Sequence, residues 1–248
     1  MAGERQRINK GFKAIRERAS RIILGTEPGW RDLQRHQDNI SDQMKNRVYI
    51  CINGILTKPS DMSNWTKRAS AWIEDNTHFN ADRYEYFSGT LTRRIFQNAR
   101  VKNIEVMINR IKKDDVYLVG HSNGCDLIQR FIAKCKRRIE ELHLIAAASE
   151  CDFKKNGFNK ALLTQKVGKI FVYFSHEDKV LEKAKSVYPY LSWMGLGYGY
   201  LGLDGAKNVD PSISDRVIAV ERKLNHSSWF SPSNFEKTMR SIVGASND

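Results

Sequence analysis

The chain has 248 residues, of which 41% are apolar, and it carries a net charge of +13. This length and composition are ordinary for one α/β domain of a soluble protein, and the positive surface attracts polyanions without determining a fold. Four scattered cysteines without CxxC spacing argue against a disulfide framework, and no segment reaches the roughly 18 continuous apolar residues of a membrane span.

Residues 4–24 form the first predicted element, an amphipathic helix. Its apolar stripe, at helical spacing, consists of Ile8, Phe12, Ile15, Ala19 and Ile22. The other faces are basic, with seven Lys or Arg side chains opposed by two Glu. Such a helix can lie on an anionic membrane, or it can pack on the domain with a solvated basic face, and both readings stay open. We assign residues 1–46 to this helical arm and a linker.

From residue 47 to residue 248, short apolar runs alternate with helical patterns. We predict six strands, at Val48–Ile52, Tyr84–Phe87, Val116–Val119, Leu142–Ala147, Ile170–Phe174 and Val217–Val220. Predicted helices between them include Trp65–Glu74, Leu91–Ile111, Asp126–Arg138 and Val180–Val187. Most of the strand runs are continuously apolar, which indicates strands covered on both faces. The alternation therefore predicts a doubly wound α/β domain with a mostly parallel, six-stranded sheet.

One segment of this domain carries a recognisable chemical pattern. The predicted strand Val116–Val119 runs into Gly120-His121-Ser122-Asn123-Gly124, and a helical pattern follows at once. Such a sharp turn strains the serine backbone and exposes its hydroxyl above the sheet, while the two glycines avoid collisions with the neighbouring strand and helix. The segment resembles the nucleophile elbow of the α/β-hydrolase superfamily, which implies that Ser122 is a nucleophile.

The resemblance also implies an acid and a base that follow the nucleophile in chain order, each on a loop at the carboxyl edge of the sheet. After the strand Ile170–Phe174 the candidates are Asp178, in a run that resembles the family's acid turn, and Glu177 as the alternative. His226 is the only histidine beyond the last predicted strand. We therefore predict that Asp178 orients His226, which takes the proton of Ser122.

The same resemblance implies an oxyanion hole built from two backbone N–H groups. One belongs to Asn123, the residue after the nucleophile. The strand Val48–Ile52 ends in Asn53-Gly54-Ile55-Leu56, similar to the family's His-Gly turn, which puts the second donor on Ile55. Asn53 stands where the family has His, and a plain Asn-Gly turn is the alternative reading.

Two features bear on the substrate. Cys151 to Gly168 leaves room for only a loop and a short helix, Phe158–Lys166, so we expect an open pocket without a large cap at this position. The stretch Tyr188–Leu203 interleaves aromatic residues and glycines; it can line an acyl pocket, act as a lid, or pack as a structural loop. We take Tyr198, from this stretch, and Trp229, three residues after His226, as candidate substrate-binding residues.

The sequence thus predicts a lipase-like serine esterase that cleaves small-molecule or lipid esters through an acyl-enzyme, without a metal or cofactor. A thioesterase or amidase with the same triad is the alternative. A non-catalytic module that binds anionic membranes or polymers is a further one, against which the ordered triad argues. Nucleic acid is not an expected partner. The scattered cysteines and the absence of a secretory signal predict a cytoplasmic protein, with peripheral membrane contact through residues 4–24 left open.

Overall fold

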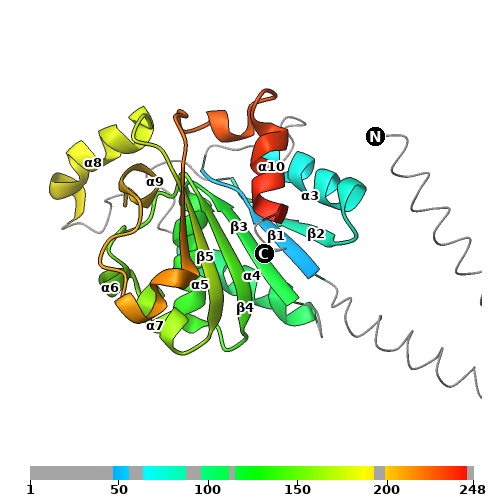
Figure 1. The fold of residues 1–248 in the computed structure, drawn as a ribbon. Helices are drawn as coiled ribbons and strands as arrows, with labels where there is room; N and C mark the ends of the chain where they lie inside the picture. The colour runs from blue at the N-terminus through cyan, green and yellow to red at the C-terminus, as the bar shows by residue number, and fades with distance from the viewer. Residues whose placement is uncertain (1–46, 56–63, 88–95, 112–114, 193–198, 245–248) are drawn as a thin grey trace, which may run out of the picture. The chain divides into compact units, whose positions relative to one another are not determined.

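A computed structural model describes residues 47–55, 64–87, 96–111, 115–192 and 199–244. The predicted arm, including the helix at residues 4–24, lies outside the described residues. The α/β alternation predicted from residue 47 onward is present, as Figure 1 shows.

The strands form one six-stranded sheet in the order β2-β1-β3-β4-β5-β6. Every pairing between them is parallel, within the part of the chain that the structure describes. Their bounds are Arg47–Ile52 (β1), Asn80–Tyr84 (β2), Asp115–His121 (β3), Ile139–Ile145 (β4), Val167–Phe174 (β5) and Val217–Glu221 (β6). The chain leaves β1 toward β2 on one side and returns to β3 on the other, so the order reverses at the carboxyl ends of β1 and β3. Open α/β sheets place their sites at such a switch point.

One strand lies earlier than the apolar run predicted. We expected a strand at Tyr84–Phe87, but β2 spans Asn80–Tyr84 and consists mainly of polar residues. The physical reason is its place at the edge of the sheet, where a strand has one neighbour and both of its faces reach solvent. The apolar signal came instead from the segment after the strand, where Tyr86 is buried.

Helices cover both faces of the sheet. Along β1, Ile50 and Ile52 point to one core cluster while Tyr49 and Cys51 point to the other, as the two-residue period of a strand requires. The first cluster lies under α4 (Gln97–Arg110), α5 (Asn123–Lys134), α6 (Phe153–Asn156) and α7 (Phe158–Leu163). The second lies under α3 (Trp65–Asn76), the short 3-10 helix η2 (Ser228–Phe230) and α10 (Phe235–Gly244).

The remaining described elements follow β5. They are α8 (Lys179–Ser192), α9 (Leu201–Asp204) and the 3-10 helix η1 (Pro211–Arg216). Helix α8 begins directly after the predicted acid loop, and α9 lies beside it in Figure 1. Within the described residues, none of the helices combines the length and the apolar character that a bilayer crossing needs.

Candidate active site

Ser122 occupies the turn between β3 and α5. Its backbone has φ 55° and ψ −122°, a conformation that residues other than glycine rarely adopt. The neighbouring strand holds this turn in place, because the N–H of Ser122 donates to the carbonyl of Ile145 at 3.0 Å. The carbonyl of Ser122 accepts from the N–H groups of Cys125 and Ala148, both at 3.1 Å. The strained turn is thus over-determined by its surroundings, as a nucleophile elbow requires.

The glycines of the motif are needed for close packing. A Cβ on Gly120 would lie 2.7 Å from Cδ1 of Ile128 in α5. A Cβ on Gly124 would lie 2.5 Å from the carbonyl oxygen of Ile52 and 2.7 Å from that of Asn53. Side chains at these two positions would therefore collide with helix α5 and with the end of β1, as the sequence predicted. Helix α5 begins at Asn123, three residues earlier than predicted, so it starts directly at the elbow.

The structure brings Ser122, His226 and Asp178 into one hydrogen-bonded chain. Nε2 of His226 lies 2.8 Å from Oγ of Ser122, and Nδ1 of His226 lies 2.7 Å from Oδ2 of Asp178. A carboxylate only accepts, so Nδ1 carries a proton and Nε2 is left to accept the serine proton. Asp178 is fully buried, and the side chain of His226 is 14% exposed. The three groups lie on three separate loops, each following the carboxyl end of a strand.

Asp178 is held by the start of helix α8. Its Oδ1 accepts the N–H groups of Val180 at 3.1 Å and Leu181 at 2.9 Å, which is the arrangement of a helix N-cap. Glu177, the alternative acid, has an exposed side chain, while its own N–H donates to Oγ of Ser175 at 3.1 Å. The structure therefore places Asp178, rather than Glu177, against the imidazole.

The loop that carries His226 is anchored at two points by side chains from other loops. Oγ of the fully buried Ser175, at the end of β5, accepts the N–H of Leu224 at 3.0 Å. Nε2 of His121, in the elbow, lies 2.9 Å from the carbonyl oxygen of His226. The sequence predicted no role for Ser175 or for His121. The position of His121 inside the motif was the one available signal.

The turn after β1 approaches the nucleophile closely. A Cβ on Gly54 would lie 3.0 Å from Cβ of Ser122 and 3.5 Å from its Oγ, so only a glycine leaves the space beside the hydroxyl open. The next residue, Ile55, is partly buried and follows in this turn. The positions of Gly54 and of Asn123, the first residue of α5, bring the two predicted oxyanion turns to the same serine.

Asn53, the residue before Gly54, supports the turn through the hydrogen bonds of its side chain. Its buried side-chain amide donates to the carbonyl of Tyr86 at 2.9 Å and accepts the N–H of Tyr86 at 3.1 Å. The Tyr86 hydroxyl in turn accepts from Nδ2 of Asn123 at 2.8 Å. Asn53 therefore ties the segment after β2 to the end of β1, and Tyr86 links that segment to the elbow.

Among solved structures, the chain is similar to an α/β serine hydrolase from Xanthomonas campestris that is described as lacking a lid. The TM-score is 0.51 at 14% identity, over 80% of this chain and 81% of that one. The chain has the α/β-hydrolase fold.

Two further similar structures are also named as α/β hydrolases. They are mouse α/β hydrolase domain-containing protein 10, with a TM-score of 0.49 and 11% identity over 81% of this chain and 89% of that one, and an α/β serine hydrolase homologue from Coxiella burnetii, with a TM-score of 0.45 and 14% identity over 81% and 85%. No protein-family profile matches the chain, and no curated protein matches its sequence significantly.

In this α/β-hydrolase fold, one of the two residues expected to bind substrate lies in the core. Trp229 is fully buried; its ring packs edge-on against Tyr173 at 6.1 Å, and the guanidinium of Arg222 lies 5.8 Å from it. It belongs to the core cluster under α10, because η2 turns it inward immediately after the His226 loop. The expectation for Trp229 is therefore wrong. Tyr198 lies outside the described residues.

The end of the aromatic and glycine-rich stretch Tyr188–Leu203 packs against the sheet. The N–H of Gly202 donates to the carbonyl of Ala147 at 2.9 Å, and the N–H of Ser175 donates to the carbonyl of Gly202 at 2.9 Å. Side chains on Gly199 or Gly202 would overlap the backbone after β4. Residues 199–204 are therefore wedged between the ends of β4 and β5, which corresponds to the structural-loop reading of this part of the stretch.

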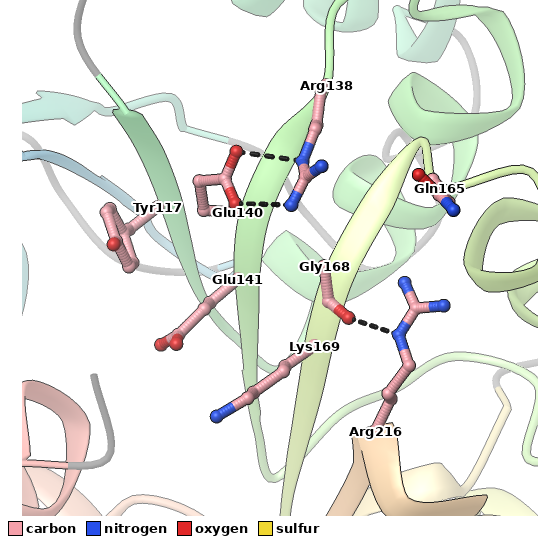
Figure 2. Close-up of a pocket in the computed structure, with 8 residues that line it drawn as sticks. All are labelled: Tyr117, Arg138, Glu140, Glu141, Gln165, Gly168, Lys169 and Arg216. Carbon is pink, nitrogen blue, oxygen red and sulfur yellow. Dashed lines mark hydrogen bonds and ion pairs between the residues drawn. The ribbon is translucent and has the colours of Figure 1, made fainter. Parts of the chain in front are cut away.

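A separate pocket lies at the opposite edge of the hydrolase-fold sheet (Figure 2). It measures about 330 Å³ and is lined by Tyr117, Arg138, Glu140, Glu141, Gln165, Gly168, Lys169 and Arg216. Most of these residues lie at or near the amino ends of β3, β4 and β5, whereas Ser122 follows the carboxyl end of β3. Arg138 pairs with Glu140 at 2.9 Å, and Arg216 donates to the carbonyl of Gly168 at 2.7 Å. Both arginines of this pocket therefore already bind other groups of the protein.

No group of three or more His, Cys, Asp or Glu side chains is placed to hold a metal ion in the described ranges. Ser122, His226 and Asp178 present a hydroxyl, an imidazole and a carboxylate in sequence.

Proposed function

We propose that the protein is a serine hydrolase that cleaves carboxylic esters. One observation carries the proposal: the Ser122 hydroxyl, the His226 imidazole and the Asp178 carboxylate are joined by contacts of 2.8 Å and 2.7 Å. A serine hydroxyl is a poor nucleophile until a base takes its proton, and a base works best when a third group fixes its orientation. A binding module would need neither arrangement.

In the proposed reaction, Oγ of Ser122 attacks the ester carbonyl while its proton passes to Nε2 of His226. The buried Asp178 carboxylate stabilises the imidazolium that forms. The tetrahedral oxyanion is bound by the backbone N–H groups of Ile55 and Asn123, with the amino end of α5 contributing its dipole. The imidazolium proton then moves to the departing alkoxide as its C–O bond breaks. Water repeats the sequence on the acyl-serine and releases the acid.

The substrate is proposed to reach an open site. Between β4 and β5 the chain has only α6 and α7, and their aromatic residues Phe153 and Phe158 are buried in the core cluster under α5. This insertion is too short to form a cap, which supports substrates such as small esters or lipids presented at a surface. The similar Xanthomonas structure is described as lacking a lid, and we propose the same for this segment.

The test is labelling with a fluorophosphonate probe, combined with hydrolysis of ester, thioester and amide panels of varied acyl length. We expect the probe to label Ser122, and Ser122→Ala to lose both labelling and hydrolysis while a thermal melt shows a folded protein. Unchanged hydrolysis by folded Ser122→Ala would contradict the proposal. The panel separates the esterase from a thioesterase or amidase, which would use the same three residues.

A further inference from the structure

His121 is the residue beside the nucleophile whose contacts the proposed reaction does not use. It ends β3 directly before Ser122, and its ring lies 5.1 Å from the ring of His226. Its Nε2 faces the backbone carbonyl oxygen of His226, at 2.9 Å, across 105 positions of sequence. This contact therefore joins the main chain of the base to the elbow of the nucleophile.

The partner determines which nitrogen of His121 carries the proton. A carbonyl oxygen only accepts hydrogen bonds, so Nε2 of His121 must be the donor. Burial, and secondarily the neighbouring His226, lower the pKa of His121 from its ordinary 6.5 to about 3. His121 is therefore neutral near pH 7, and as a neutral imidazole with Nε2–H it has one donor, directed at the carbonyl.

Aromatic rings hold His121 in this orientation. Trp65 of α3 meets it edge-on at 6.2 Å, and Phe230 of η2 meets it at 5.5 Å and 85°. Trp65 and Phe230 also stack on each other at 4.1 Å, so they form a rigid wall. The charged or titratable groups around this wall are His226, Asp178 behind it, and Arg68, which donates to the carbonyl of Phe230 at 3.1 Å.

We infer that His121 is a positioning residue for the catalytic base: its Nε2–H holds the carbonyl of His226 and so fixes the loop that aims the imidazole at Ser122. The inference rests on the proposed function, which makes His226 the base. It assigns His121 no proton transfer. Its role is complementary to that of Ser175, which holds the N–H of Leu224 two residues upstream.

The need for such an anchor follows from where His226 sits. The base lies in an irregular loop between β6 and η2, where no strand or helix ladder holds the backbone. A misplacement of about 1 Å in a catalytic group can cost on the order of 100-fold in rate. Two side-chain anchors restrict this loop, one from β5 at the N–H of Leu224 and one from the elbow at the carbonyl of His226 itself. The geometry of Nε2 and Oγ is therefore set before substrate arrives.

The activity test uses two substitutions at one position. His121→Phe keeps a ring between Trp65 and Phe230 but has no donor, whereas His121→Gln can place an amide N–H near the same carbonyl. We expect His121→Phe to lower kcat on a small soluble ester by about 10- to 100-fold with KM nearly unchanged, because the base is misaligned while substrate binding is not. We expect His121→Gln to recover most of the loss. His176→Gln, at a histidine that is 62% exposed on the acid loop, is the matched control and should keep full activity.

Two results of the activity test would overturn the inference. One is full activity of His121→Phe, and the other is an activity of folded His121→Gln as low as that of His121→Phe. Both results leave the proposed function intact, because the proposed function is tested by Ser122→Ala.

If His121→Phe does not fold, the wild-type protein still provides a test through two-bond 1H–15N spectra, with His121→Gln used for assignment. We expect His121 to remain a neutral Nε2–H tautomer from about pH 5 to pH 8. A neutral Nδ1–H tautomer would contradict the inference, because Nε2 would then have no proton to donate to the carbonyl of His226.

Discussion

Asp178 divides its carboxylate between helix α8 and His226. One oxygen accepts the backbone N–H groups of Val180 and Leu181 and caps the helix, and the other lies 2.7 Å from Nδ1 of His226. The same buried side chain therefore begins a helix and orients the proposed base. The helix cap needs only a hydrogen-bond acceptor, whereas the imidazolium needs a negative charge beside it. A substitution can therefore separate the two roles.

Asp178→Asn should separate them. Asn caps helices as well as Asp, so we expect a nearly unchanged melting temperature. Turnover should fall by about three to four orders of magnitude, because the imidazole loses its negative partner and its correct tautomer. Glu177→Gln, one residue away and exposed, is the control and should cost little. A large loss in Glu177→Gln with an active Asp178→Asn would move the acid to Glu177. Melting curves and steady-state rates on one ester are the measurements.

Gly124→Ala should damage stability and activity together. The new methyl group would meet the carbonyl oxygens of Ile52 and Asn53, which are backbone atoms that cannot rotate away. We expect a loss of about 1–3 kcal/mol in the free energy of unfolding, together with lower kcat, because the displaced strand end leads into the Gly54 turn. Gly244→Ala, at the end of α10 with open space around it, is the matched control and should be neutral or slightly stabilising. Urea denaturation measures the free energy of unfolding of both variants. Equal values for Gly124→Ala and Gly244→Ala would contradict this prediction.

Asn53→Ala should show how much the turn before Gly54 depends on the Asn53 side chain. The substitution leaves the N–H and the carbonyl of Tyr86 without their buried partner, and each unpaired group costs about 1–3 kcal/mol. We expect a destabilisation of about 2–4 kcal/mol and a lower kcat, since the turn that carries Ile55 loses its support. Asn103→Ala removes only an exposed 3.5 Å contact to the Tyr84 hydroxyl and serves as the control. A stability of Asn53→Ala within the range of Asn103→Ala would refute this role.

The partly buried His121 should also make the fold sensitive to acid. Its pKa is about 3 in the fold against an ordinary 6.5, so between these values the unfolded chain binds a proton that the folded chain does not. Stability from this group is therefore present above pH 6.5 and is lost as the pH falls, by up to about 1.4 kcal/mol per pH unit.

His121→Gln lacks this titration, so its stability should fall less than that of the wild type between about pH 6 and pH 4. His143, whose pKa burial also lowers, is present in both proteins, so the difference between their pH profiles reports on His121. Chemical denaturation at several pH values gives the comparison. Parallel profiles for the two proteins would show that His121 titrates normally in the fold.

The sequence alone was sufficient for the architecture and for the elbow. The strand, the Gly-x-Ser-x-Gly turn and the helix are contiguous, so their geometry follows from local sterics, and the structure has Ser122 at φ 55° as the motif demands. Continuous apolar runs located most strands because both faces of a parallel sheet are buried. The order of Ser122, Asp178 and His226 along the chain then predicted three loops at one sheet edge, since parallel strands all end there.

Only the tertiary structure decided which neighbouring side chains meet. Glu177 and Asp178 are adjacent, and the start of α8 turns one to the imidazole and the other to solvent. Trp229 is aromatic and close to His226 in sequence, which suggested substrate binding, yet η2 turns its side chain into the core. His121 and His226 are 105 residues apart. Periodicity and composition describe what a residue prefers within its own element, whereas these contacts depend on how loops from separate strands are packed against one another.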